Sequence, residues 1–459
     1  MTAPTRPHIV VIAADTLRPA YLGCYGNTAM HTPNLDRLAA QSIRFTHAHP
    51  EALPTIPTRR TVHGGRRVYP FADYRPVPWD NVYLAGWQPM AAEEPTVTEA
   101  LEAAGYHTGF VADVPHYFVP GMNFTRGFRQ WQFVRGQAED HFGAEAAADP
   151  ALLPRYRARV ARRHLVNVRP QAPEEEWPTA RTFRWAQQFL EQNAAGDRPL
   201  YLYVDSFTPH ETWEAPLHYY DLYGSRAARE PVWLSVPYGP LAEVPELEAQ
   251  LPSVRANYAG LVTMVDHWCG LLLDTIDRLG MTERTLVLFF SDHGTNFADN
   301  PEGIVGKPAG WMYPGTMHIP LLLRLPDGRG AGTECANLAS TADIPATVAA
   351  AAGLSGLPLD GTSLAAAADG TYAGYDYLTC RYGNHVWYRD PRTWFFSSLE
   401  FTGARLFDLE ADPECRNNVA ERLPERVASA RERMLADAGG RLIRHDPPAA
   451  TDAIGRRPA

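Results

Sequence analysis

Acidic and imidazole side chains follow three apolar runs of the sequence, where they could act together on a ligand. Asp15 ends the run HIVVIAAD, Asp205 lies near the end of PLYLYVDSF, and the pair Asp292-His293 follows TLVLFF. Carboxylates beside an imidazole suit a divalent cation. An aspartate at a strand end also caps turns and helices, so each one alone is weak evidence. Together they predict Asp15, Asp292 and His293 as metal ligands.

A hydroxyl that could act as a nucleophile lies in the segment LPTIPTRRTVHGGR, residues 53–66. A bound metal lowers the pKa of a hydroxyl, so Thr55 is predicted both as nucleophile and as a further metal ligand. Arg59 follows one helical turn later, and its guanidinium could hold a phosphate or sulfate oxygen. The alternative is that Thr55 or Thr58 only caps the helix.

Lys307 is the only lysine among the 42 lysine and arginine residues of the chain. A composition that replaces lysine by arginine keeps a lysine where a compact ammonium on a flexible stem is needed. Chance survival is the alternative. We predict a functional role for Lys307.

The elements that position these residues alternate between short apolar runs and amphipathic stretches, which is typical of an α/β fold with buried strands. Predicted strands cover residues 8–15, 107–113, 199–207, 285–292 and 319–326, and predicted helices cover 33–42, 96–105, 180–194, 254–279 and 343–352. In an open α/β sheet the carboxyl ends of the strands face the ligand crevice. The strand-end acids are therefore expected to converge.

The last hundred residues differ in character. After residue 355 the sequence predicts short antiparallel strands and a terminal helix over 423–443. We therefore predict a catalytic domain over residues 1–355 and a smaller α+β subdomain over 356–459. Residues 130–180 and 210–250 are expected to form long excursions over the active face.

Bulk composition excludes some classes of protein. The 459 residues carry a formal charge of −10, which predicts no binding to nucleic acid or to an anionic membrane. The five cysteines are scattered without CxxC pairing, which favours free thiols in a reducing compartment. The apolar run near the N-terminus is too short for a signal peptide or a membrane span. We expect a cytoplasmic protein.

The chain resembles the sulfatase family of the alkaline phosphatase superfamily. The resemblance rests on segments that occur in the family's order between residue 8 and about residue 420: IVVIAADTLRPAYLGCYGN, TPNLDRLAAQSIRF, PTIPTRRTVHGGR, TVTEALEAAGYHTGFVAD, SDHG, HIPLLLRLPDG, TADIPATVAAAAGL and LFDLEADPECRNNVA. It implies a hydrolase with a large central mixed sheet flanked by helices, a smaller C-terminal subdomain and one divalent metal at the nucleophile.

The resemblance also assigns residues. It places Asp15, Asp292 and His293 on metal-ligand positions, and it places the nucleophile motif, Cys or Ser followed by x-Pro-Ser/Thr-Arg, on residues 55–59. A family lysine that contacts the transferring group falls on Lys307. A histidine that binds this group or protonates the leaving oxygen falls on His210, a role that suits an imidazole.

Two departures from the family pattern bear on function. One of two adjacent acids at the first strand end is absent, because the pair here is Ala14-Asp15. Typical family members convert the motif's Cys or Ser to formylglycine, and Thr55 cannot form that aldehyde. Related phosphodiesterases and phosphoryl transferases use a plain threonine, so phosphorus chemistry is favoured over sulfate.

Three further side chains are predicted to bind substrate. His116 matches a histidine of the family's Lys-Trp-His stretch, although Asp113 replaces the lysine there. Trp213 could select the organic part of the substrate or belong to the core. His318 could reach the site, or even a second metal site with Asp205 and His210, or it could simply precede a strand.

The predicted activity is metal-dependent hydrolysis of phosphodiesters or phosphonate monoesters, with Thr55 as the covalent nucleophile. A sulfatase without formylglycine, a phospho-group transferase and a non-catalytic binding protein are the alternatives. The expected cofactor is one divalent ion, Mn, Zn, Ca, Mg or Fe, and the expected partner is a small anionic ester. The sequence leaves a homo-oligomer open.

Overall fold

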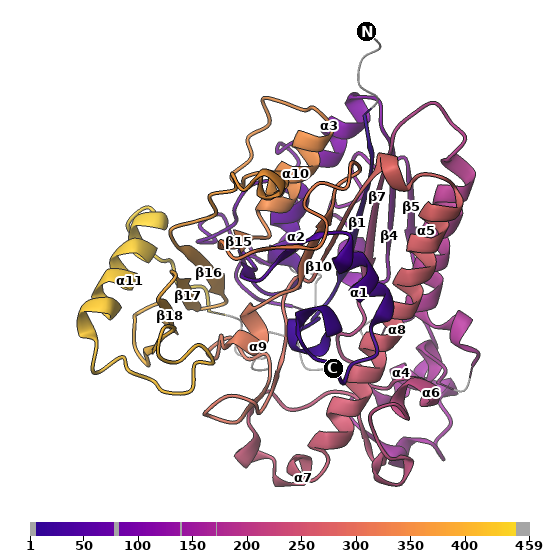
Figure 1. Ribbon diagram of the computed structural model, residues 1–459. Coiled ribbons are helices and arrows are strands. Elements are labelled where there is room, and N and C mark those ends of the chain that lie inside the picture. Colours follow the sequence, from indigo (N-terminus) through magenta and orange to yellow (C-terminus); the bar gives the residue numbers. More distant parts are fainter. Residues whose placement is uncertain (1–5, 78–81, 138–139, 171, 447–459) are drawn as a thin grey trace.

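Buried apolar strands form the centre of the protein, shown by a computed structural model that describes residues 6–77, 82–137, 140–170 and 172–446 (Figure 1). Eight strands make one sheet, in the order β14 (Thr333–Cys335), β2 (Ile43–Phe45), β13 (Leu321–Arg324), β10 (Thr285–Phe290), β1 (His8–Ala14), β7 (Leu200–Ser206), β4 (His107–Ala112) and β5 (Gln130–Phe133). Strand β13 is antiparallel to both of its neighbours, and the other pairs are parallel. The sheet is therefore mixed, as expected.

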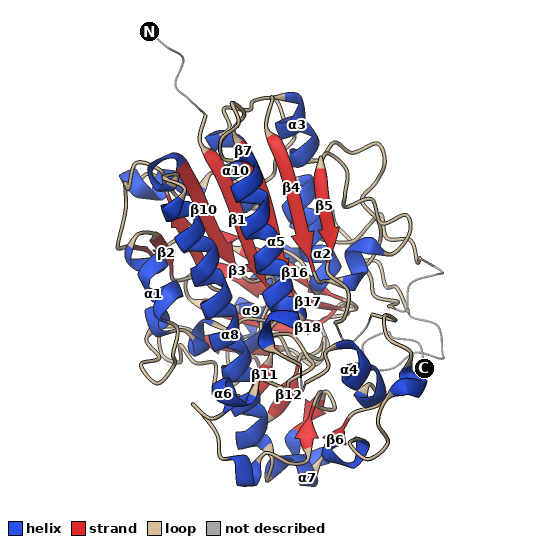
Figure 2. Ribbon diagram, turned by 90° about the vertical axis from the view of Figure 1, so that its right-hand side faces the viewer, coloured by secondary structure: helices blue, strands red, loops and turns tan. Residues whose placement is uncertain are grey.

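Helices cover both faces of this sheet (Figures 1 and 2). One face packs against α1 (Pro33–Ala40), α5 (Pro178–Asn193) and the long α8 (Leu251–Arg278), and the other against α2 (Thr55–Gly64), α3 (Val97–Ala103) and α10 (Asp343–Ala351). Alternate residues of β1 enter the two cores, with Val10 and Ile12 on the α8 side and Ile9 and Val11 on the α2 side. A strand buried on both faces reads as a continuous apolar run, which is why the sequence predicted it well.

Short elements surround the carboxyl ends of the central strands. They are β3 (Ala48–His49) with β15 (Ala339–Ser340), β6 (Tyr156–Arg157) with β8 (Val232–Trp233), the three strands β11 (Asn296–Phe297), β12 (Ile304–Gly306) and β9 (Gly239–Pro240), and the helices α4 (Ala161–Asn167), α6 (Leu217–Tyr220), α7 (Pro245–Glu248) and α9 (Pro314–Met317). Most of them belong to the two predicted excursions. Lys307 directly follows β12.

The C-terminal part is a separate antiparallel sheet. Its strands are β16 (Leu378–Tyr382), β17 (His385–Arg389), β18 (Thr393–Ser398) and β19 (Arg405–Asp408), and α11 (Pro424–Asp437) covers one face (Figure 1). The other face packs Trp387 and Trp394 against Leu53, Tyr313 and Met317. The C-terminal sheet therefore supports the loop that leads into α2.

Several expectations can be compared with this architecture. The α/β fold with a C-terminal antiparallel sheet is confirmed. The domain boundary at residue 355 stays a prediction, and residues 1–5 and 447–459, the outer ends of the two predicted domains, lie outside the described residues. All five cysteines are free thiols. Within the described ranges, no helix is both long enough and apolar enough to cross a bilayer.

Candidate metal centre and active site

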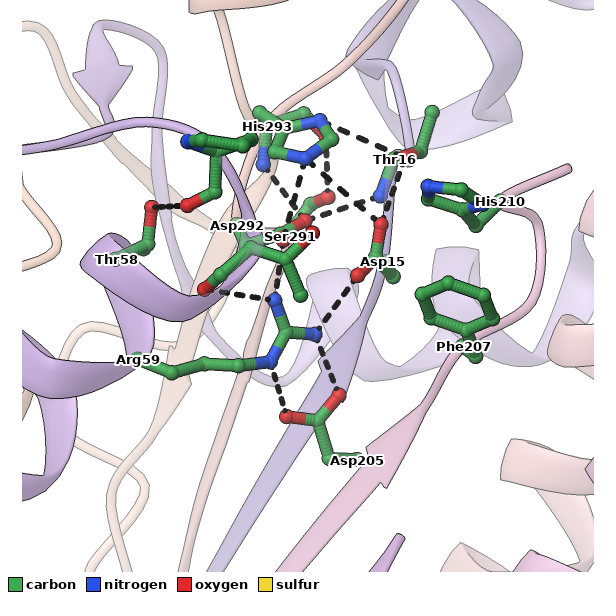
Figure 3. A network of polar contacts seen from close by, with 12 residues as sticks. Asp15, Thr16, Thr58, Arg59, Asp205, Phe207, His210, Ser291, Asp292 and His293 are labelled. Carbon is green, nitrogen blue, oxygen red and sulfur yellow. Dashed lines mark hydrogen bonds and ion pairs between the residues drawn. The ribbon is translucent and has the colours of Figure 1, made fainter. Parts of the chain in front are cut away.

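Three neighbouring strands bring the predicted acids together. Asp15 follows β1, Asp205 lies in β7, and Asp292 comes two residues after β10. Strand β1 pairs with β7 on one side and with β10 on the other, with all three parallel. Their carboxyl ends meet at one edge of the sheet, so the side chains converge as predicted (Figure 3).

Asp15, Asp292 and His293 form a buried cluster whose ligand atoms all lie within 4.8 Å of one another. His293 Nε2 lies 3.4 Å from Asp292 Oδ2 and 3.9 Å from Asp15 Oδ1. His293 Nδ1 lies 3.0 Å from the Gly294 carbonyl oxygen, which can only accept, so Nδ1 carries the proton. The Nε2 lone pair therefore faces the two carboxylates.

Thr16 holds this cluster in place, a role that no pattern of residues predicted. Its hydroxyl donates to Asp15 Oδ1 at 2.7 Å, and its backbone N–H donates to Asp292 Oδ1 at 3.0 Å. Its φ of 63° lies in the left-handed region, which a β-branched residue rarely adopts. Such strain persists where surrounding contacts enforce it, often at a functional site.

The cluster fits a divalent cation. Asp15 Oδ2 and His293 Nε2 are buried and make no hydrogen bond. Burial, and secondarily Lys307, lowers the pKa of His293 to about 4, so the imidazole is neutral at pH 7 and able to ligate. Burial and the neighbouring Asp292 raise the pKa of Asp15 well above its usual range. A bound dication would offset the cost of burying these groups. It would stabilise both carboxylates and bind the free lone pair of the imidazole nitrogen.

Arg59 binds three aspartates at the end of the sheet (Figure 3). Its Nε and Nη2 donate to Asp205 at 2.9 and 2.8 Å, its Nη2 forms an ion pair with Asp15 at 3.0 Å, and its Nη1 donates to Asp292. Nη1 also donates to the Thr55 carbonyl oxygen at 3.3 Å. Every N–H group thus faces the protein. Arg59 balances the charge of the aspartates and positions α2, and its contact with the substrate's oxygens stays a prediction.

Thr55 is the first residue of α2, whose N-terminus carries the positive end of the helix dipole. The side chain is buried at 3% exposure, and its hydroxyl makes no hydrogen bond with any described residue. The predicted capping role falls to neither threonine, because α2 has no side-chain cap and Thr58 instead donates to the carbonyls of Ala52 and Pro54. Arg59 links Thr55 to the metal cluster through its bond to the Thr55 carbonyl.

Lys307 lies beside His210, and the functional roles of both residues stay predictions. Lys307 Nζ lies 3.1 Å from His210 Nε2, and His210 Nδ1 lies 2.8 Å from the Glu211 carbonyl oxygen. Because an ammonium only donates and a carbonyl only accepts, the imidazole carries its proton on Nδ1. The charge of Lys307 is felt at Asp15 and His293, so this pair belongs to the same electrostatic site.

Glu211 is a second member of the site that sequence reasoning missed. Its Oε2 accepts from Lys307 Nζ at 2.7 Å, and its Oε1 accepts from the Tyr238 hydroxyl at 2.7 Å. Burial would raise the pKa of Glu211, but Lys307 and His210 outweigh it and hold that pKa well below its usual range. The available signal was the acid next to His210 in the segment PHETW.

His116 stays a predicted substrate-binding residue. Its ring packs edge-on against Trp87, with 4.8 Å between ring centroids, and lies 6.4 Å from Phe207, which stacks on His210. Asp113, which replaces the family lysine, is fully buried. It accepts from the Phe207 backbone N–H at 2.6 Å and from Gln137 Nε2 at 2.5 Å. With Asp113 in place of the family lysine, this position links two loops and carries no cation.

The structure places Trp213 in the core, whereas His318 stays a predicted substrate-binding residue. Trp213 has no exposed surface, donates to the Pro209 carbonyl oxygen at 3.1 Å and packs on Phe297 in the core, so it does not line a substrate site. His318 Nε2 hydrogen-bonds to the Thr46 carbonyl oxygen at 2.8 Å, and the ring packs near His49. Neither residue joins the metal cluster. Across the described residues, Asp15, Asp292 and His293 are the one group that could hold a metal ion, which leaves the second metal site without support.

The fold and site define an α/β protein with a candidate divalent-metal centre at the carboxyl edge of its sheet. A protein-family model described as Sulfatase matches residues 7–354. The chain therefore belongs to the sulfatase family.

Known proteins resemble the chain over different lengths. An ulvan-active sulfatase of Formosa agariphila is 28% identical over 331 residues, which are 70% of this chain and 57% of that protein. An arylsulfatase of Clostridium perfringens is 25% identical, with 95% of both chains covered. The crystal structure of a phosphonate monoester hydrolase of Agrobacterium radiobacter matches with a TM-score of 0.71 and 20% identity, covering 94% of this chain and 95% of that chain. At that identity the last match shows the fold alone.

Proposed function

We propose that the protein is a metal-dependent hydrolase of phosphodiesters or phosphonate monoesters, with Thr55 as its covalent nucleophile. The observation that carries this proposal is the placement of Thr55. Its hydroxyl has no hydrogen-bond partner among the described residues, it begins α2, and Arg59 ties it to the Asp15, Asp292 and His293 cluster. A threonine at the family's nucleophile position favours phosphorus, because water can release a phosphoryl group from a plain alcohol.

Asp15, Asp292 and His293 would hold the metal ion, and we propose Thr55 as its further ligand. When bound, a divalent ion supplies Lewis-acid stabilisation of the ester oxygens and a lower pKa for the attacking hydroxyl. Carboxylate and imidazole ligands together accept Mn, Zn, Ca, Mg and Fe.

Residues of the protein carry out the displacement of the leaving group at phosphorus. The Thr55 oxygen forms a bond to phosphorus while the bond from phosphorus to the leaving oxygen breaks, and the hydroxyl proton passes to solvent. We assign protonation of the leaving oxygen to His210 together with Lys307, whose Nζ lies 3.1 Å from His210 Nε2, and we assign stabilisation of the ester's negative charge to the Lys307 ammonium. Water then attacks phosphorus, and the Thr55 hydroxyl is restored. The N-terminus of α2 favours the negative charge that develops beside it.

Replacement of Thr55 tests the assignment. Thr55→Ala should lower kcat on bis(4-nitrophenyl) phosphate by at least about 10³-fold, the order seen when a nucleophile is removed. Thr55→Ser keeps the hydroxyl and should retain measurable turnover. Metal content, measured by elemental analysis, should change little in either variant. Unchanged turnover of Thr55→Ala would refute the role of Thr55.

Sulfate ester hydrolysis is the second candidate function, favoured by the sulfatases among the relatives. A side-by-side assay separates the candidates. We expect 4-nitrophenyl phenylphosphonate or bis(4-nitrophenyl) phosphate to give a higher kcat/KM than 4-nitrophenyl sulfate. Added acceptor alcohols would reveal a transferase by diverting the product. We further propose that a small anionic ester is the only partner the site requires.

A further inference from the structure

Lys307, the only lysine of the chain, forms an ion pair with the buried carboxylate of Glu211. Lys307 and Glu211 are 4% and 6% exposed, and their charged atoms are 2.7 Å apart. An ion pair hidden from water is electrostatically much stronger than one on the surface. Lys307 therefore does not present a full unbalanced positive charge to a ligand.

Two further contacts fix this pair. The Tyr238 hydroxyl donates to Glu211 Oε1, and the Tyr238 ring lies under Lys307, with 5.6 Å from Nζ to the ring centroid. Tyr238 immediately precedes β9, Lys307 follows β12, and these two strands pair. A Cβ atom at Gly306 would lie 2.2 Å from the Tyr238 ring, so this approach requires glycine. The three-stranded sheet of β9, β11 and β12 thus places Tyr238 and Lys307 beside Glu211.

The other cation of the site is balanced in the same way. Arg59 forms ion pairs with Asp15, Asp205 and Asp292. His210 lies between the two groups, with Nε2 facing Lys307 and Nδ1 facing Glu211. Both cations described in this site thus have carboxylate partners. A substrate with two negative charges would meet the field of Glu211 as well as that of Lys307.

We propose that Glu211 is a specificity-determining residue, which offsets the Lys307 charge so that the site favours esters with one negative charge over esters with two. The inference rests on the proposed function, since it concerns the same site. Phosphodiesters, phosphonate monoesters and sulfate monoesters carry one charge, whereas phosphate monoesters carry two near pH 8. The groups that face Glu211 are Lys307, His210 and Tyr238.

Turnover of a matched pair of esters tests the inference. The ratio of kcat/KM for bis(4-nitrophenyl) phosphate to that for 4-nitrophenyl phosphate is measured at pH 8 with the metal-loaded protein. Glu211→Gln removes the charge and should lower this ratio by about tenfold or more. Glu211→Asp keeps the charge and should leave the ratio within about threefold of the wild-type value. A ratio that Glu211→Gln leaves unchanged overturns the proposal.

Glu214→Gln is the matched control. Glu214 is an equally buried carboxylate three residues further on, but it pairs with His164 at 2.7 Å instead of Lys307. Its replacement should leave the ratio unchanged. If Glu214→Gln shifts the ratio as strongly as Glu211→Gln does, the effect comes from disturbance of the loop and the proposal fails.

Measurements of anion binding distinguish failure of this proposal from failure of the proposed function. Calorimetry with the Thr55→Ala variant compares dimethyl phosphate, a single anion, with inorganic phosphate, mostly a double anion at pH 8. Glu211→Gln in that background should tighten phosphate binding relative to dimethyl phosphate by about tenfold. This result would support Glu211 even if the protein hydrolysed neither ester. In the protein with Glu211 present, tighter binding of phosphate than of dimethyl phosphate would overturn the proposal even if Glu211→Gln did not fold.

Discussion

At the scale of single residues, charge balance decides what each side chain can do. Arg59 is surrounded by three buried aspartates, which balance its charge. Burial of a charge is costly unless it is paired, and here the guanidinium and the carboxylates compensate one another. Lys307 and Glu211 likewise compensate each other's buried charge. Thr55 differs from all of them because its hydroxyl is uncommitted.

Loss of Arg59 should therefore destabilise the protein strongly. Arg59→Met leaves the aspartates without their cation, and we expect the free energy of unfolding to fall by about 3–5 kcal/mol. Arg66→Met is the control, because Arg66 pairs with Asp360 at the surface, with its side chain 53% exposed. It should cost at most about 1 kcal/mol. Urea unfolding at pH 8 measures both, and equal losses would contradict the account.

At the scale of elements, the site is assembled by strand ends and by loops linked across the sheet. The C-terminal sheet supports the loop before α2 through Leu53, and the small sheet of β9, β11 and β12 places Lys307. Asp113, which follows β4, joins the chain after β7 to Gln137. These links hold together segments that lie far apart in sequence.

The link through Asp113 predicts a pH dependence of stability. Burial raises the pKa of Asp113 to about 7, so the folded protein holds this proton more tightly than the unfolded chain does. Its stabilising contribution is present at low pH and is lost as the pH rises toward 7. Asp113→Asn should therefore become more stable relative to wild type by about 2 kcal/mol between pH 5.5 and 8.5. Urea unfolding at both pH values checks this, and a difference independent of pH would contradict it.

At the scale of the whole molecule, the metal ion should couple the site to the stability of the fold. A ligand that binds only the folded state stabilises it by about 2.7 kcal/mol at a hundred times its Kd. Removal of the ion with a chelator should lower Tm, and its return should restore Tm. Asp292→Asn, which removes a ligand charge, should lose this response. A Tm that responds equally in both proteins would place the metal elsewhere.

The sequence predicted the large features well and the small ones poorly. The strand predicted over 8–15 is β1, His8–Ala14, and the helix over 254–279 is α8, because long apolar or amphipathic patterns survive in any context. The convergence of Asp15 and Asp292 followed from strand order. The roles of Thr16 and Glu211 could not be predicted, because they depend on contacts across 276 and 96 positions of the chain.

The central claim is that the Thr55 oxygen attacks the ester directly. The most direct measurement is peptide mapping by mass spectrometry after acid quench of the metal-loaded protein with a slowly cleaved phosphonate ester. The account predicts a phosphonyl group on Thr55, formed as quickly as the first equivalent of alcohol is released. Turnover with no adduct on Thr55, or with the adduct on another residue, would contradict it.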